Sequence, residues 1–230
     1  MDSGRVALGL HDLIPVFLAA GGLIAIAAAV RRTQPDSHRA AALGAAFIVL
    51  GGLSKASAKL IGAVSASTPP QLLDDALFPL LAPGMLLLAV AVVAVLRAGG
   101  WARLGAAHSL LIPVAVWGLT GALALLSGST AATALLIGLT TLGNVVLAVA
   151  LIAWSRRLGL RNSAVLYGIN LVIVIGLAGM ARALEQTTAT EWIEQSVNLV
   201  GQLAFLVASR SLFSAVMGRS AARRANARPA

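Results

Sequence analysis

Seven long apolar runs constrain this chain more than any other feature of its sequence. A helix of about 20 apolar residues crosses the roughly 30 Å hydrocarbon core of a bilayer. Runs of about this length or longer cover Asp12–Val30, Ala40–Val64, Leu72–Leu96, Leu104–Leu126, Ala131–Trp154, Val165–Leu184 and Ile193–Met217. They are continuous, whereas the strands of a membrane barrel alternate in polarity, and backbone groups in lipid must be hydrogen-bonded internally. The sequence therefore predicts an all-α, polytopic membrane protein with seven transmembrane helices.

The composition agrees with this class. Hydrophobic residues make up 59% of the 230 residues and charged residues only 11%, whereas about a quarter of a soluble domain is charged. These values exclude an ordinary soluble enzyme and a disordered chain, and the absence of cysteine excludes a disulfide-stapled secreted domain. The runs leave connections of at most ten residues. We therefore expect a single seven-helix transmembrane domain at residues 1–217 and a basic cytoplasmic tail at residues 218–230.

The charged residues divide unequally between the two sides of the predicted bundle. The odd-numbered connections, the tail and the inner end of the last run, with Arg210, hold 13 basic residues and one acid, and the other side holds four basic residues and seven acids. Positively charged loops stay in the cytoplasm, so we expect the N-terminus outside and the C-terminus in the cytoplasm. The net charge of +9 is then an orientation signal, and no nucleic-acid partner is expected.

The basic residues also indicate a source. Only two of the 17 are lysines, a usage typical of GC-rich bacterial genomes. We therefore expect a multi-pass protein of a bacterial plasma or inner membrane, with the lipid bilayer as its main partner. A homo-oligomer or a partner protein within the membrane remains open.

The seventh run carries a polar stripe. Glu194, Asn198 and Gln202 are spaced by four residues and share one side of a helix, and Gln195 adds another polar group. At 1.5 Å per residue the stripe descends from the outer surface toward the middle of the bilayer. Facing lipid it would be intolerable, so it must face the bundle interior or a water-filled cavity. We take this stripe as the leading candidate for a ligand-binding site.

Two lysines lie in the outer half of the second run. Lys55 and Lys59 are four residues apart and share a helical face. Lys59 can extend to the interface, but Lys55 is one turn deeper, where an unpaired charge costs on the order of 3 kcal/mol. We expect a carboxylate partner for Lys55, with Glu194 first and Glu185 second. A structural salt bridge explains such a pair as well as a ligand site does.

The third run combines acids with prolines. Asp74 and Asp75 suit the positive end of a helix dipole, after an N-terminal cap over Thr68–Gln71. Pro79 and Pro83 predict a kink. An interrupted helix beside a polar cavity is a device that transporters use, although kinked spans without such a role are common.

No catalytic signature accompanies these polar residues. The sequence has no His-Glu-x-x-His, no Gly-x-Ser-x-Gly and no P-loop, so no catalytic or metal-binding residue is predicted and an enzyme is disfavoured. Seven spans with an outside N-terminus match the rhodopsin topology. The seventh run has no lysine, however, and no retinal Schiff base is expected there; other cofactors remain unknown.

Three classes of function stay open. The first is a binding or transport protein with a polar pocket open to the extracytoplasmic side for a small polar or charged ligand. Its candidate ligand-binding residues are Lys55, Glu194, Asn198, Gln202, Lys59, Glu185 and Gln195. The second is a sensory or accessory membrane subunit that acts through a partner. The third is a membrane enzyme acting on lipid at the outer leaflet, with Glu194 or Glu185 as general base.

Overall fold

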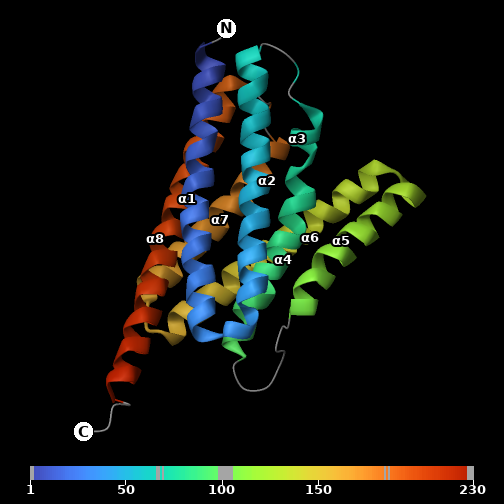
Figure 1. Ribbon diagram of the computed structural model, residues 1–230. Coiled ribbons are helices and arrows are strands. Elements are labelled where there is room, and N and C mark those ends of the chain that lie inside the picture. Colours follow the sequence, from blue (N-terminus) through green and yellow to red (C-terminus); the bar gives the residue numbers. More distant parts are fainter. Residues whose placement is uncertain are drawn as a thin grey trace.

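The computed structural model describes residues 3–65, 68, 70–97, 106–183, 185 and 187–226, and this part of the chain is almost entirely helical, without a strand (Figure 1). The elements are α1 (Ser3–Thr33), the short 3-10 helix η1 (Pro35–Ser37), α2 (His38–Ser65), α3 (Gln71–Asp75), α4 (Leu77–Leu96), α5 (Ala106–Ser127), α6 (Ser129–Arg157), α7 (Arg161–Ala183) and α8 (Thr188–Asn226). In these ranges seven segments are long and apolar enough to cross a membrane, one of them made by α3 and α4 together. The all-α fold and the number of candidate spans are confirmed, and a multi-pass membrane protein is indicated.

Several helices extend beyond the apolar runs. Helix α8 continues nine residues past Met217, through the start of the basic tail to Asn226, because alanine and arginine favour helix outside lipid as well. The connections are correspondingly short. Gly159, with φ of +76°, ends α6, and the amides of Gly159 and Leu160 bond to Arg156 and Ser155 in a Schellman motif. The predicted start at Leu104 lies outside the described residues.

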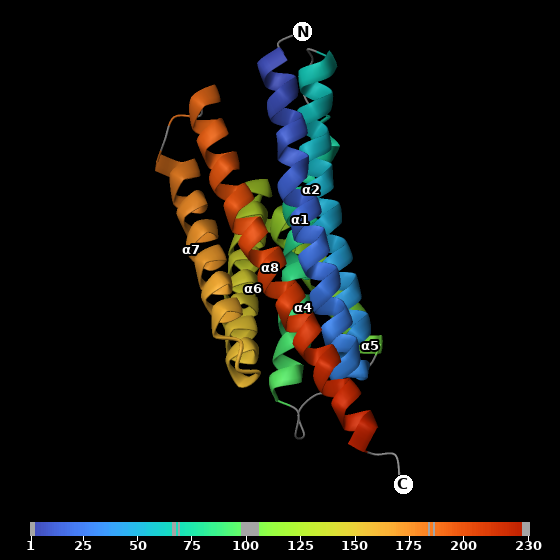
Figure 2. The same cartoon turned by 90° about the vertical axis from the view of Figure 1, so that its left-hand side faces the viewer.

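The long helices form a ring. Contacts connect α1 to α2, α2 to α4, α4 to α6, α6 to α7, α7 to α8 and α8 back to α1, while α5 packs outside the ring against α4 and α6. Helices α1 and α8 begin at the same end of the bundle, where the chain's N-terminus lies (Figures 1 and 2). We call this the N-terminal end, and the opposite end the C-terminal end.

The main core lies toward the C-terminal end. Its buried residues begin at Leu23 in α1, Leu87 in α4, Leu147 in α6 and Phe205 in α8, and stop at Ile48 in α2. Each of these limits lies partway along its helix, so the same half of every helix is left outside the core. The main core cluster therefore fills the C-terminal half of the bundle, and the N-terminal half lies outside it.

Close helix contacts depend on glycine at a few positions. A Cβ on Gly44 of α2 would lie 2.8 Å from the carbonyl oxygen of Gly84 in α4, and one on Gly143 of α6 would lie 2.8 Å from Met85 Cβ. Small residues at such points let helices approach closely in lipid. Glycine therefore sets the spacing of α2, α4 and α6.

The third span is interrupted, and a neighbouring helix compensates for its second proline. Pro79 lies in the first turn of α4, where its missing N–H costs little. Pro83 lies inside α4 and cannot donate to the carbonyl of Pro79 four residues earlier. The indole Nε1 of Trp117, on α5, donates to that carbonyl at 2.8 Å. A side chain of α5 thus replaces the missing backbone donor.

Candidate functional site

Two lysine–aspartate pairs gather at the N-terminal end of the bundle. Lys55 Nζ lies 2.6 Å from Asp74 Oδ1, and Lys59 Nζ lies 3.0 Å from Asp12 Oδ2. Because the lysines are one turn apart on α2, they reach different neighbours: Lys55 binds α3, and Lys59 binds α1. The two ion pairs thus connect three consecutive elements on one side of the ring.

The expected pairing of Lys55 with Glu194 is wrong, since the carboxylate that it binds belongs to Asp74. The sequence argument placed Asp74 in the first turns of a capped helix. In the structure α3 is only five residues long, and its N-cap is Pro70, which provides no side-chain hydrogen bond, so the predicted cap over Thr68–Gln71 is also wrong. The chain leaves α3 after Asp75, and the break brings Asp74 against α2.

The pair formed by Lys59 and Asp12 is the more buried of the two. The Asp12 side chain is 7% exposed and that of Lys59 34%, so Lys59 turns inward to a carboxylate instead of extending only to the interface. Asp12 Oδ1 and His11 Nδ1 are also buried, and neither has a hydrogen-bond partner in the described part of the chain. An unsatisfied buried polar group costs about 1–3 kcal/mol. These two atoms are therefore the costliest polar groups at this end of the described bundle.

Hydrogen bonds from α2 also hold the break in the third span. Ser54 Oγ donates to the carbonyl of Leu73 at 2.8 Å, one residue before the carboxylate that Lys55 binds. The last carbonyls of a helix have no partner within it, so the hydroxyl satisfies one that the break exposes. Close approach is possible because the facing residue is Gly51, where a Cβ would lie 3.1 Å from the carbonyl oxygen of Leu77.

Helix α8 lies next to α1 at this end. The rings of His11 and Trp192 lie 5.4 Å apart, which places the first turns of α8 beside those of α1. Glu194, Asn198 and Gln202 are half-buried, and the Gln202 amide donates to Asn198 Oδ1 at 3.3 Å.

The polar stripe faces the bundle. At 3.6 residues per turn it lies on the same side of α8 as the buried Phe205, Ser209 and Leu212. The other side of this segment carries the exposed apolar side chains of Ile193, Val200, Leu203 and Val207. This half of α8 thus has its polar side inward and its apolar side outward, as lipid surroundings require.

The remaining predicted residues lie at the edge of this group. Glu185 is exposed in the connection between α7 and α8, where its backbone carbonyl accepts a hydrogen bond from Thr190 Oγ1 at 2.8 Å. Gln195 is half-buried on α8. The polar residue Gln186 beside them lies outside the described residues. Asp12 and His11 were not among the predicted site residues, because Lys59 was expected to extend to the interface and to need no acid; the position of Asp12 at the start of a neighbouring span was the signal that could have identified it.

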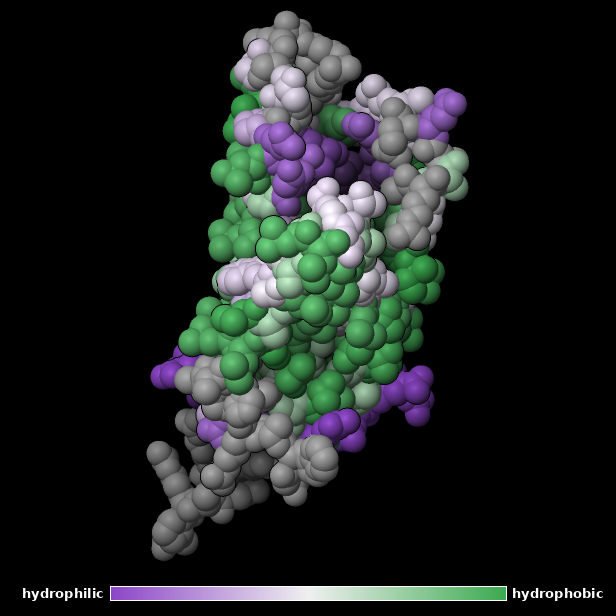
Figure 3. Space-filling model, turned by 90° about the vertical axis from the view of Figure 1, so that its right-hand side faces the viewer, coloured by the Kyte–Doolittle hydropathy of each residue, from purple (hydrophilic) through white to green (hydrophobic). Residues whose placement is uncertain are grey.

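Hydrophilic residues surround a hollow near the N-terminal end (Figure 3). A broad hydrophobic band lies below them, and hydrophilic residues return at the C-terminal end. The hollow is seen on the face that carries the third span and the hairpin of α5 and α6. The surface thus has the zoning of a membrane protein, with a polar recess above its apolar band.

The chemistry available here is ionic and hydrogen-bonding. Within the described ranges, no group of three or more His, Asp or Glu side chains is placed to hold a metal ion. No family model, curated protein or solved structure matches this chain.

Proposed function

We propose that this protein binds or transports a small polar or charged ligand through a pocket at the N-terminal end of the bundle. The basic connections lie at the C-terminal end, so the positive-inside rule orients the pocket toward the extracytoplasmic side of a bacterial plasma or inner membrane. Residues 1–217 form the transmembrane domain in this proposal, and residues 218–230 form a cytoplasmic tail.

The pair of Lys59 with the buried Asp12 carboxylate is the observation that carries the proposal. Removing a carboxylate from water costs several kcal/mol, and apolar residues of similar volume are often at least as stable. A purely structural contact would not need one carboxylate oxygen left without a partner, as Asp12 Oδ1 is among the described residues. A ligand with its own donor would bind that oxygen, and its own acceptor would bind a lysine.

The pocket offers both kinds of group. Lys55 and Lys59 supply ammonium donors, and Asp12 supplies an acceptor. On the other flank of α1, the stripe on α8 and its neighbours add carboxylate and amide groups, namely those of Glu185, Glu194, Gln195, Asn198 and Gln202. This mixture favours a ligand that carries both signs or many hydroxyl groups, such as an amino acid or a monosaccharide.

Binding would also act on the interrupted span. A ligand anion that bound Lys55 would compete with Asp74 for the ammonium, and α3 would lose one of its two polar contacts with α2. Transporters also build substrate sites beside interrupted helices. Partner exchange at Lys55 is thus the step that would couple occupancy to a change in shape, and protons could accompany it.

The test begins with the full-length protein in detergent, screened by thermal shift against free amino acids and monosaccharides. A compound that stabilises the protein is then measured for binding and for uptake into proteoliposomes. We expect Glu194→Gln and Asp74→Asn to abolish or strongly reduce both while the protein remains folded. Asp75 is exposed at the same end, so Asp75→Asn is the matched control and should behave as wild type.

Unchanged binding and uptake in Glu194→Gln and Asp74→Asn would reject the pocket. Two other outcomes would select the alternative functions. Turnover of a membrane lipid by the pure protein, lost in Glu194→Gln, would identify an enzyme. A stoichiometric membrane partner that co-purifies, without any stabilising compound, would identify an accessory subunit.

A further inference from the structure

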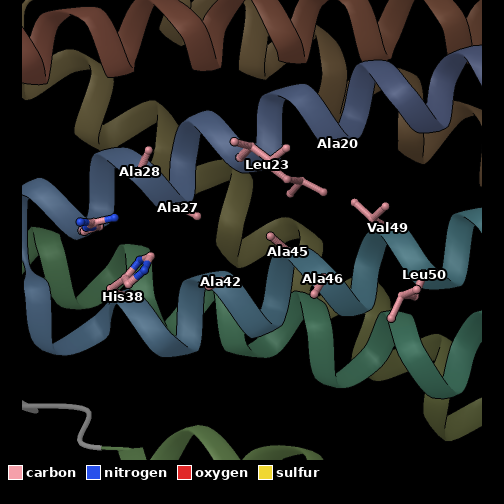
Figure 4. A pocket seen from close by; sticks show the side chains of 12 residues that line it. Ala20, Leu23, Ala27, Ala28, His38, Ala42, Ala45, Ala46, Val49 and Leu50 are labelled. Carbon is pink, nitrogen blue, oxygen red and sulfur yellow. The ribbon is translucent and has the colours of Figure 1, made fainter.

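A second, unlike cavity lies between α1 and α2 toward the C-terminal end of the bundle (Figure 4). It is an open groove of about 560 Å³. Its apolar lining comes from both helices and consists of Ala20, Leu23, Ile24, Ala27, Ala28, Ala42, Ala45, Ala46, Val49 and Leu50. Arg31 and His38 complete the lining at the end near the connection of the two helices. We infer that this groove binds an anionic phospholipid, independently of the pocket proposed above.

The length of the groove fits one leaflet. From Ala20 to Arg31 along α1 is eleven residues, or about 16 Å at 1.5 Å per residue. This is about half of a hydrocarbon core of roughly 30 Å. Alanine at half of the lining positions leaves the volume of the groove unfilled by protein side chains. An acyl chain that runs from the membrane surface to the midplane therefore matches the groove in length and polarity.

The charged end of the groove fits a phosphate. Arg31 lies in the last turn of α1 and His38 is the first residue of α2, so the short connection brings them to the same end. A guanidinium binds phosphate oxygens through paired hydrogen bonds. His38 lines the same end of the groove, and an imidazole ring can add a second N–H donor to the phosphate. Among the described residues that line the groove there is no carboxylate to oppose an anion.

The occupant is thus a lipid whose phosphate binds Arg31 and His38 and whose acyl chain lies on the alanines. In the orientation proposed above it comes from the cytoplasmic leaflet. Surface attraction by the many arginines at this end would hold any anionic lipid loosely. Binding in the groove differs from this surface attraction because it requires a headgroup and an acyl chain at defined positions.

Native mass spectrometry of the full-length protein in detergent tests this. The probes are phosphatidylglycerol and phosphatidylcholine with identical acyl chains. We expect phosphatidylglycerol to bind at least fivefold more tightly. Arg31→Gln with His38→Gln should remove that preference, and Arg31→Lys should retain part of it. Arg32 is exposed beside Arg31 and does not line the groove, so Arg32→Gln is the matched control and should retain the full preference.

A second variant tests the contribution of the acyl chain. Ala46 is exposed in the groove, so Ala46→Phe fills it without disturbing the buried core and should weaken both lipids severalfold. Equal binding of the two lipids by wild type would overturn the inference, as would an equal loss in Arg32→Gln and Arg31→Gln. Displacement of the bound lipid by glycerol 3-phosphate alone would show that the acyl chain contributes nothing to binding. That result would also overturn the inference.

Discussion

The Asp12 carboxylate lies in an environment that is unusual for a charged group. It is buried, it binds Lys59 through one oxygen, and its other oxygen has no partner among the described residues. Stability and function make different demands at such a position. A pair of apolar residues would satisfy the fold, but it would leave nothing with which to bind a ligand.

A double-mutant cycle separates these roles. Lys59→Met alone leaves the Asp12 carboxylate buried without its cation, and we expect it to lower the free energy of unfolding by about 2 kcal/mol. The value is below that for a fully buried pair because Lys59 is a third exposed. Adding Asp12→Leu should restore stability, since an apolar pair replaces the ionic one.

Denaturant unfolding in detergent measures the stabilities, and the thermal-shift ligand measures the pocket. The double variant should be as stable as wild type yet bind no ligand. A double variant that is less stable than Lys59→Met would show that the ion pair is required for folding.

At the scale of elements, the break between α3 and α4 and the proline inside α4 are held by neighbouring helices. Ser54 and Lys55 hold the break from α2, and Trp117 holds the proline-exposed carbonyl from α5. The sequence indicated that the third span would bend. It did not indicate which side chains would bind the backbone carbonyls that the bend leaves without a donor. That information depends on which helices are neighbours.

The contact of Trp117 has a specific prediction. Trp117→Phe removes the indole donor to the Pro79 carbonyl and should cost about 1 kcal/mol, the net value of a typical hydrogen bond. In a Pro83→Ala background the backbone amide of residue 83 returns and can bond that carbonyl, so Trp117→Phe should then cost much less.

Unfolding free energies of the four proteins in the cycle measure the coupling. An equal cost of Trp117→Phe in both backgrounds would mean that the indole contributes only by packing, for example through its edge contact with Phe47 at 5.7 Å between ring centroids.

Features that depend on one helix and its lipid surroundings could be predicted from the sequence, and contacts that depend on neighbouring helices could not. Helix number and type could be predicted because lipid imposes long apolar runs, and the side of α8 that faces inward could be predicted because Glu194, Asn198 and Gln202 cannot face lipid. The partner of Lys55 could not. It depends on the break after Asp75 and on α2 lying against α3, and neither is a periodic property of the chain.

At the scale of the whole molecule, the orientation in the membrane is open to a direct test. The chain has no cysteine, so each introduced cysteine is unique. Gln71 is exposed at the N-terminal end, where α3 begins, and Asp36 is exposed in the connection between α1 and α2 at the other end. We expect a membrane-impermeant thiol reagent to label Gln71→Cys but not Asp36→Cys in intact cells, and both after permeabilisation.

Labelling of Asp36→Cys alone in intact cells would show that the topology is the inverse of the expected one. The candidate pocket would then face the cytoplasm, and the basic end would lie outside, contrary to the positive-inside rule.

The position of the core has a mechanical consequence. Helix α8 is 39 residues long, about 58 Å, and it is clamped by the core from Phe205 onward. Its first turns, near Glu191, therefore extend about 21 Å beyond the clamp. A tilt of about 5° about that fulcrum moves Glu191 by about 2 Å, the scale on which a hydrogen bond is made or lost. Because α8 also contacts α1 through Trp192 and α7 through Gly201, such a tilt would carry those neighbours with it, and a change in packing at the C-terminal end would reach the end where the polar groups gather.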